Sequence, residues 1–197
     1  MKEIRKIVIA PDSFKGTMEA SQVCQIIQGS ARQYFPDAAV RCIPMADGGE
    51  GMVDAYLKLL GGRKVLLSVQ GLQGRPVACY YGILPDGTAV MEMAACAGLP
   101  LLDGALDPMH TTTYGVGEML LHAERNGVRR VLLGIGGSAT VDCGLGMAAA
   151  LGYRFLNKDG AAVEAVTCHM AEIAAIVPPA RKPALDIIAA CDVDNPL

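Results

Sequence analysis

The sequence predicts an α/β protein with an incomplete Rossmann-like parallel sheet domain and a second α/β domain that has mixed or antiparallel strands. Short, near-continuous apolar runs, typical of strands buried on both faces, alternate with helical segments that carry an apolar stripe. In one stretch the apolar period changes to two, which is typical of antiparallel strands. With 197 residues, of which 52% are hydrophobic, the chain can bury one good core, or one domain and much of another.

The first sixty residues repeat one plan of strand, loop and helix. Strands are expected at residues 4–10 and 39–43, and helices at residues 18–34 and 52–60. Apolar residues spaced three and four positions apart in the first helix predict one face packed on the sheet. A glycine pair ends the second helix.

The period of two begins at Lys64. The strands expected here are residues 65–70, 76–84 and 88–94, with Pro85-Asp86-Gly87 as a hairpin turn. We therefore expect residues 1–63 to be the first segment of the Rossmann-like domain and residues 64–197 to form the second domain. On this division the chain ends before the first domain is completed.

Helices and strands alternate again in the rest of the chain. After a hydroxyl-rich start at residues 110–118, the expected elements are a helix to Arg125, a strand at 131–135, a helix that continues to Leu151, a strand at 153–156, a helix at 167–176 and a strand at 185–190. The last strand has the apolar pattern of a strand covered on both faces, yet no helix follows to cover it.

The segment from Val131 to Leu151 predicts a strand, a glycine turn and a helix. Gly134, Gly136 and Gly137 permit a close approach of backbone that a Cβ atom would block. Ser138 or Thr140 can cap the helix, whose first N–H groups then offer an anion site. Asp142 would repel a phosphate there unless it holds a metal ion or accepts a proton, and the first possibility makes it a candidate metal ligand.

The same turn nearly fits the dinucleotide fingerprint, because Gly134, Gly136 and Ala139 match its glycine spacing after a strand. A nicotinamide-dependent oxidoreductase would use them on the pyrophosphate and Asp159 on the ribose. This alternative leaves the glycine-rich loop that follows the second strand unexplained. A third class, a small-anion-binding module without turnover, would keep the loops and lack catalysis.

Polar clusters follow four of the expected strands. They are Asp12, Ser13 and Lys15; Asp47 and Glu50 with Gly48, Gly49 and Gly51; Ser138, Thr140 and Asp142; and Asp192, Asp194 and Asn195. Ligands of open α/β sheets bind beyond the carboxyl ends of strands, so we expect these clusters to converge on one cleft. Backbone donors, a lysine and carboxylates that bind Mg²⁺ suit phosphoryl transfer.

Composition excludes several other classes. A net charge of −3 and 5% aromatic residues predict no nucleic-acid partner. No apolar run approaches the length of about 18 residues that a membrane span needs. The seven cysteines are widely spaced and odd in number, which argues against zinc and disulfides and favours the cytoplasm.

Four segments carry a resemblance to the bacterial type I glycerate kinase family. They are Ile9 to Gly16, Pro44 to Gly51, Gly136 to Thr140 and Cys191 to Leu197. The resemblance implies ATP-dependent phosphorylation of D-glycerate, mostly to 2-phosphoglycerate, on two α/β domains around a cleft, with ATP and Mg²⁺ as cofactors. Val141 and Cys143 stand where such proteins often have Asn and Gly. The family continues well past the last of these segments, so we expect this chain to be a truncated, inactive form.

Roles for the site residues follow from the clusters and the resemblance together. The candidates are Asp47, Asp192 and Lys15 for catalysis; Asp12, Ser13, Lys15 and Arg75 for substrate; Gly48, Gly49, Gly51, Gly136, Gly137, Ser138 and Thr140 for phosphate; and Glu50, Asp142 and Asp194 for metal. The expected partner is the small molecule glycerate. Apolar surface left uncovered favours homo-oligomers.

Overall fold

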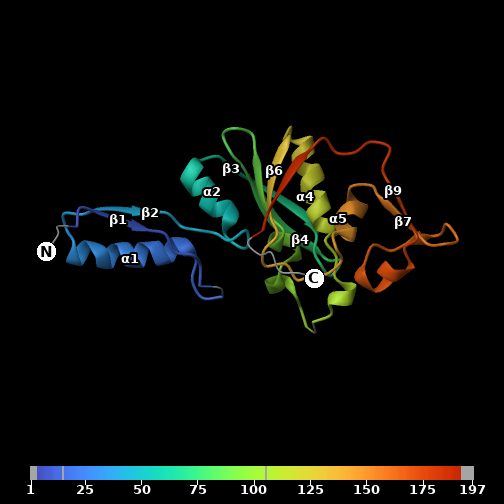
Figure 1. The fold of residues 1–197 in the computed structure, drawn as a ribbon, viewed down its shortest axis with the longest axis horizontal. Coiled ribbons are helices and arrows are strands. Elements are labelled where there is room, and N and C mark those ends of the chain that lie inside the picture. The colour runs from blue at the N-terminus through green and yellow to red at the C-terminus, as the bar shows by residue number, and fades with distance from the viewer. Residues whose placement is uncertain (1–3, 15, 105, 192–197) are drawn as a thin grey trace.

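A computed structural model describes residues 4–14, 16–104 and 106–191 of the chain. It contains a five-stranded sheet in the middle, a two-stranded sheet at one end and a three-stranded sheet at the other (Figure 1). The α/β class expected from the sequence is confirmed. None of the helices formed by these residues combines the length and hydrophobicity needed to cross a lipid bilayer.

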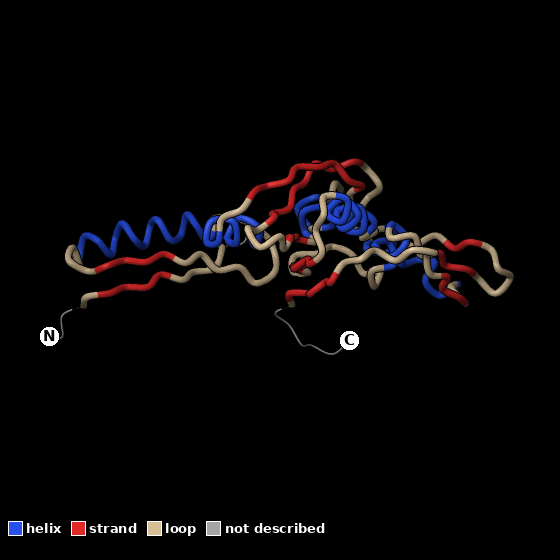
Figure 2. Tube along the Cα trace, turned by 90° about the horizontal axis from the view of Figure 1, so that it is seen from above, coloured by secondary structure: helices blue, strands red, loops and turns tan. Residues whose placement is uncertain are grey.

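The N-terminal unit extends from the rest of the molecule as an arm, which Figures 1 and 2 show from two directions. Its strands β1 (Lys6–Ile9) and β2 (Ala39–Cys42) are parallel, with Ile9 opposite Cys42. Helix α1 (Ala20–Tyr34) contacts both strands and buries Val23 and Cys24. The rest of its apolar stripe is less covered, since Ile26 and Ile27 are exposed.

The central sheet is mixed and continuous, in the order β10-β6-β5-β4-β3. Its strands are β3 (Arg63–Gln70), β4 (Pro76–Ile83), β5 (Ala89–Glu92), β6 (Arg130–Gly134) and β10 (Asp186–Ala190). The first three pair antiparallel, and the expected hairpin joins β4 to β5, whereas β5, β6 and β10 run parallel. β10 lies at the edge with Ile187 and Ile188 exposed, so the described residues do not cover it on both faces.

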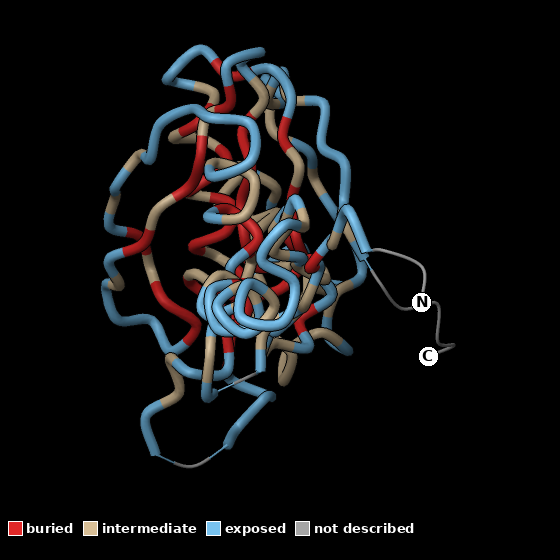
Figure 3. Tube along the Cα trace, turned by 90° about the vertical axis from the view of Figure 1, so that its left-hand side faces the viewer, coloured by how far each residue is buried: buried red, intermediate tan, exposed pale blue. Residues whose placement is uncertain are grey.

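Helices cover both faces of this sheet. Helix α2 (Met52–Leu60) packs on one face with Val90, while Met91 faces the larger core on the other side beneath α4 (Tyr114–Arg125). Side chains alternate along β5, so one short strand supplies both cores. Figure 3 shows buried segments gathered in the interior. The contacts of α2 therefore place it on the central sheet, although the domain boundary expected from the sequence assigns this helix to the first segment of the Rossmann-like domain.

Two expectations about helices were wrong. Helix α5 (Leu145–Ala150) begins after Gly144, so neither Ser138 nor Thr140 caps it. Residues 167–176 form a short 3-10 helix, η3 (Thr167–Glu172), and then enter strand β9 (Ala175–Val177). Backbone hydrogen bonds to a neighbouring strand outweigh the weak helical pattern of so short a segment.

That neighbouring strand is β7 (Arg154–Leu156), which pairs antiparallel with both β9 and β8 (Ala162–Val163). The remaining short elements of the described chain precede α4. They are α3 (Ala94–Ala97), η1 (Leu99–Leu101) and η2 (Pro108–His110).

The two glycine-rich segments of the sequence contact each other at the carboxyl ends of β6 and β10. The Gly136 N–H donates to the Gly48 carbonyl oxygen at 3.1 Å. A Cβ atom on Gly134 would collide with that same carbonyl group, and one on Gly48 would lie 2.8 Å from the Ala190 carbonyl oxygen. These glycines therefore permit two loops and a strand end to approach with no side chains between them.

This contact predicts that Gly134→Ala destabilises the protein by about 1–3 kcal/mol, the usual effect of overpacking. Gly29→Ala is the matched control, because Gly29 lies in α1 with open space where its Cβ would be. It should raise the free energy of unfolding by about 0.5–1 kcal/mol through better helix propensity. Chemical denaturation measures both. Equal effects of the two substitutions would contradict the close approach.

Candidate active site

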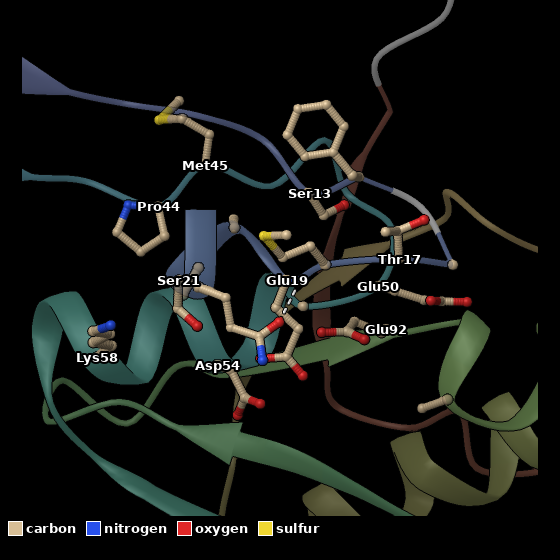
Figure 4. Close-up of a pocket in the computed structure, with 18 of the residues that line it drawn as sticks. Ser13, Thr17, Glu19, Ser21, Pro44, Met45, Glu50, Asp54, Lys58 and Glu92 are labelled. Carbon is tan, nitrogen blue, oxygen red and sulfur yellow. Dashed lines mark hydrogen bonds between the residues drawn. The ribbon is translucent and has the colours of Figure 1, made fainter. Parts of the chain in front are cut away.

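A cavity of about 690 Å³ lies between the loop and first turn of α1, helix α2, the middle of β4 and the end of β5. Its size falls within the range of about 300–1,000 Å³ that is usual for ligand sites. The polar residues that line it, most of them labelled in Figure 4, are Ser13, Thr17, Glu19, Ser21, Gln22, Glu50, Asp54, Lys58, Tyr80 and Glu92. The cavity thus brings together Ser13 and Glu50, from two of the expected clusters.

The loops after β1 and β2 run side by side to form one wall. The Met45 N–H donates to the Pro11 carbonyl oxygen at 2.9 Å. The first loop then turns tightly, with the Phe14 N–H donating to the Met18 carbonyl oxygen at 2.8 Å. This turn places Ser13 and Thr17 on the cavity wall. Parallel strands end at the same edge of a sheet, which is why two loops distant in sequence meet here.

Glu92, at the end of β5, fixes the start of α2. Its side chain is 7% exposed, and its Oε1 accepts the Val53 N–H at 2.7 Å. A carboxylate at a helix N-terminus satisfies donors that have no partner in the helix and interacts favourably with the helix dipole. The sequence leaves open whether Glu92 faces solvent or a cleft, and the structure places it on the cavity wall.

Burial raises the pKa of Glu92 above its ordinary value. The N–H groups of Val53 and Gly51 lower this pKa, whereas the nearby carboxylates of Asp54 and Glu50 raise it further. The balance is upward because a charge loses hydration when it is buried. A cation that entered the cavity would oppose this effect by stabilising the ionised form.

Acidic side chains outnumber basic ones in the cavity lining. Among its described lining residues Glu19, Glu50, Asp54 and Glu92 are acidic and Lys58 is basic, and Asp54 also pairs with Lys64 Nζ at 2.6 Å. In Figure 4, Thr17, Glu50 and Glu92 lie on the side away from Lys58. No three acidic, histidine or cysteine side chains of the described residues are arranged to hold a metal ion by themselves. One or two carboxylates can still bind Mg²⁺ when waters or substrate phosphates complete its coordination.

Asp142 has a different environment from the one expected of a metal ligand. It is 1% exposed, and its Oδ2 accepts the Thr113 N–H and hydroxyl, both at 2.8 Å, and the Gly146 N–H at 3.0 Å. Its Oδ1 accepts the Gly144 N–H at 3.0 Å. These bonds join the starts of α4 and α5, and they favour a structural role for this carboxylate.

In the turns that were expected to bind phosphate, several N–H groups donate to acceptors of the protein itself. The Gly49 N–H donates to Asp47 Oδ1 at 2.9 Å, and the Gly136 N–H donates to Gly48. Gly137 accepts a hydrogen bond from Leu99, and Ser138 forms a β-bridge with Gly98. Gly51 lines the first cavity, whereas Ser138 and Thr140 line a second one.

The remaining expected residues are dispersed. Asp12 is exposed and its Oδ1 accepts the Ser13 N–H. Arg75 is 80% exposed and pairs with Asp103 at 3.4 Å, and it lines neither cavity. Lys15, Asp192 and Asp194 lie outside the described residues. The end of β10, which leads to the last two, touches Gly48 through Ala190.

The dinucleotide fingerprint is not supported by this geometry. A helix should begin directly after the glycine turn so that its first N–H groups face the pyrophosphate. Here α5 begins at Leu145, six residues beyond Ala139, and the Ala139 N–H donates to the Ala97 carbonyl oxygen. Asp159 lies in the turn between β7 and β8, within the three-stranded sheet at the other end of the molecule (Figure 1).

Several cavity residues were not among the candidates. Asp54 and Lys58 are four residues apart on α2 and therefore share a helix face. That spacing was the available signal, although it also fits an ordinary solvated surface. Glu92 stands in a buried strand between two methionines, which alone could not reveal its partner forty residues earlier.

The raised pKa of Glu92 predicts a specific pH dependence of stability. Ionised Glu92 is less favourable in the folded than in the unfolded chain, so its ionisation should lower the free energy of unfolding as pH rises above about 4.5. Glu92→Gln should remove this part of the dependence. The free energy of unfolding of the mutant, relative to that of the wild type, should therefore increase between about pH 4 and 7. Denaturant titrations across this range measure it, and Glu164→Gln controls for the change in net charge. A difference that does not vary with pH would contradict the assignment.

Asp142→Asn should lower the free energy of unfolding by about 2–3 kcal/mol. The amide loses the charge-assisted hydrogen bonds, and its NH₂ group faces N–H and hydroxyl donors instead of acceptors. Asp103→Asn makes the same chemical change in an exposed ion pair and should cost under about 1 kcal/mol. Urea denaturation measures both variants. A loss for Asp142→Asn no larger than that of the control would refute its structural role.

Comparison with known proteins relates the chain to glycerate kinases. The glycerate kinase family model matches residues 7–197. A glycerate kinase from Halalkalibacterium halodurans is 43% identical over 196 residues, and glycerate 2-kinase from Escherichia coli is 41% identical over 199 residues. These alignments cover 97% and 98% of this chain, and 52% of each relative.

The fold comparison agrees. A crystal structure of a proposed glycerate kinase 2 from Salmonella typhimurium LT2 superposes with a TM-score of 0.82 at 40% identity, and it covers 98% of this chain and 53% of that one. The chain spans about half the length of the curated relatives it matches.

Proposed function

Because this chain belongs to the glycerate kinase family, we propose that it takes part in the ATP-dependent phosphorylation of D-glycerate to 2-phosphoglycerate. The observation that carries the proposal is the cavity that is lined both by hydroxyl groups of one strand-end loop, Ser13 and Thr17, and by the Glu50 carboxylate of the next. Phosphoryl transfer depends on positioning and charge neutralisation more than on covalent chemistry, and such a lining suits it.

Glycerate binds, on this proposal, against the loop that precedes α1. Ser13 and Thr17 line the cavity and offer hydroxyl donors to its carboxylate or hydroxyl groups. Phe14 and Gly16, the neighbours of Lys15, also line it, which supports a substrate or catalytic role for that lysine. Arg75 is the weaker candidate, because its partner in the structure is an exposed carboxylate.

Glu50 would be the residue that holds Mg²⁺ brought in by the nucleotide. Glu50 is exposed at the start of α2 and faces the cavity, so it can reach a metal that brings its own phosphate and water ligands. The ion would supply the positive charge that the acidic lining lacks. Asp47 holds the glycine turn through Gly49 and would orient this segment, and Asp192 and Asp194 would complete the site from the end of β10.

Binding to the folded chain tests the proposal without requiring turnover, because a ligand that binds only the native state raises its melting temperature. We expect MgATP and glycerate each to stabilise the protein and NADH to have no effect. A coupled assay with both substrates then tests phosphorylation. Stabilisation by NADH and not by MgATP would favour the oxidoreductase alternative and overturn the proposal.

Glu50→Gln should weaken MgATP binding about 10-fold or more, since a charge-assisted contact contributes about 1.5–3 kcal/mol. Binding of ATP without Mg²⁺ should change little or improve, because one negative charge has been removed. Glu164→Gln, at an exposed position outside the cavity, is the control. Isothermal titration calorimetry with and without Mg²⁺ measures the difference, and equal losses in both conditions would rule out a metal role for Glu50.

A further inference from the structure

A second cavity, of about 300 Å³, lies on the opposite side of the end of β5. Consecutive residues mark the division, because Glu92 lines the first cavity and Met93 lines the second. The second cavity is enclosed by the ends of β5 and β6 and the starts of α4 and α5. Its apolar lining residues are Met93, Val116, Leu133, Ile135 and Met147, and its hydroxyl-bearing ones are Thr113, Ser138 and Thr140.

This lining is unsuited to a phosphate. The described residues around the cavity include no lysine, arginine or histidine, and they include the carboxylate of Asp142. A phosphate would therefore lose its hydration among apolar side chains and gain no opposite charge. A flat, uncharged ring system meets no such penalty, and a cavity at the small end of the usual range can take one ring system but not a whole nucleotide.

Thr140 gives the cavity an unsatisfied polar group. Its hydroxyl oxygen is buried and has no hydrogen-bond partner among the residues that the structure describes. A buried hydroxyl without a partner is unfavourable, so a ligand that offers a ring nitrogen or an exocyclic amine would relieve it. Ser138 and Cys143 are exposed residues of the same lining, so they mark its open side.

The two cavities are connected by one segment of chain. Gly136 contacts Gly49 at the first cavity's glycine loop, and two residues later Ser138 lines the second cavity. A nucleotide with its base in the second cavity can therefore extend its phosphates along this turn toward Glu50. Phosphates placed in this way leave the apolar lining and approach the acidic cavity, where Mg²⁺ is required.

We propose that the second cavity binds the purine ring of the nucleotide, with the Thr140 hydroxyl hydrogen-bonded to the ring. This inference rests on the proposed function, in which a nucleotide is a substrate. It assigns Ser138 and Thr140 to the base end of the nucleotide, whereas the sequence suggests that they bind phosphate.

Adenosine probes binding of the base end of the nucleotide, and inorganic tripolyphosphate probes binding of its phosphate end. We expect adenosine to bind the wild-type chain, and Thr140→Val to weaken that binding about threefold to tenfold, the effect of losing one neutral hydrogen bond. Tripolyphosphate with Mg²⁺ should bind wild type and Thr140→Val equally. Thr167→Val is the matched control, because the Thr167 hydroxyl is also buried without a partner but lies outside this cavity.

Ser138→Trp provides a second variant, since a large side chain at the exposed edge should block adenosine without altering the core. Calorimetry on the full chain measures each affinity. Absence of adenosine binding at millimolar concentration, or equal affinity in wild type, Thr140→Val and Ser138→Trp, overturns the base site. If MgATP still binds and glycerate is phosphorylated in that case, the proposed function stands and only the base site is wrong. If MgATP does not bind either, both fail.

Discussion

Two buried carboxylates at the starts of two helices hold the candidate site in place. Glu92 accepts N–H groups at the start of α2, and Asp142 does the same at the start of α5. Glu92 lies at the end of β5 and therefore ties α2 to the central sheet. Asp142 also accepts the N–H and hydroxyl of Thr113, so it ties the start of α5 to the start of α4. The anion that the N-terminus of each helix attracts is thus supplied by the protein itself. A phosphate at either helix start would have to displace a buried carboxylate.

The glycine-rich segments illustrate why such turns are ambiguous in sequence. A turn that lets a phosphate approach the backbone and a turn that lets another loop approach it both require the absence of a Cβ atom. Here Gly48, Gly134 and Gly136 meet one another, and their spacing is explained by that contact. The contact still serves the site indirectly, because it brings the segment that carries Glu50 against the ends of β6 and β10.

The sequence predicted what depends on local patterns and missed what depends on partners distant in the chain. The bounds of α2 and the β4–β5 hairpin were predicted well, because amphipathic spacing and turn residues determine them. The late start of α5 was not, since it follows from Asp142 bonding to Thr113 nearly thirty residues earlier. β9 was assigned to a helix because only its pairing with β7 makes it a strand.

Of the candidate site, Ser13 and Glu50 line one cavity, as expected from their strand-end positions. Glu92, Asp54 and Lys58 could be recognised as cavity residues only from the fold, which brings them near.

The charge distribution of the two cavities constrains the chemistry more than any single residue does. The first cavity presents four carboxylates and one ammonium group among its described residues, and the second presents apolar side chains with one engaged carboxylate. On the proposed function both substrates are anions, and the described lining of neither cavity carries enough positive charge to neutralise a triphosphate. A cation that accompanied the nucleotide would offset this charge, and the acidic side chains would then act as ligands or orienting groups for that cation. In that arrangement an acidic lining is compatible with the proposed phosphoryl transfer.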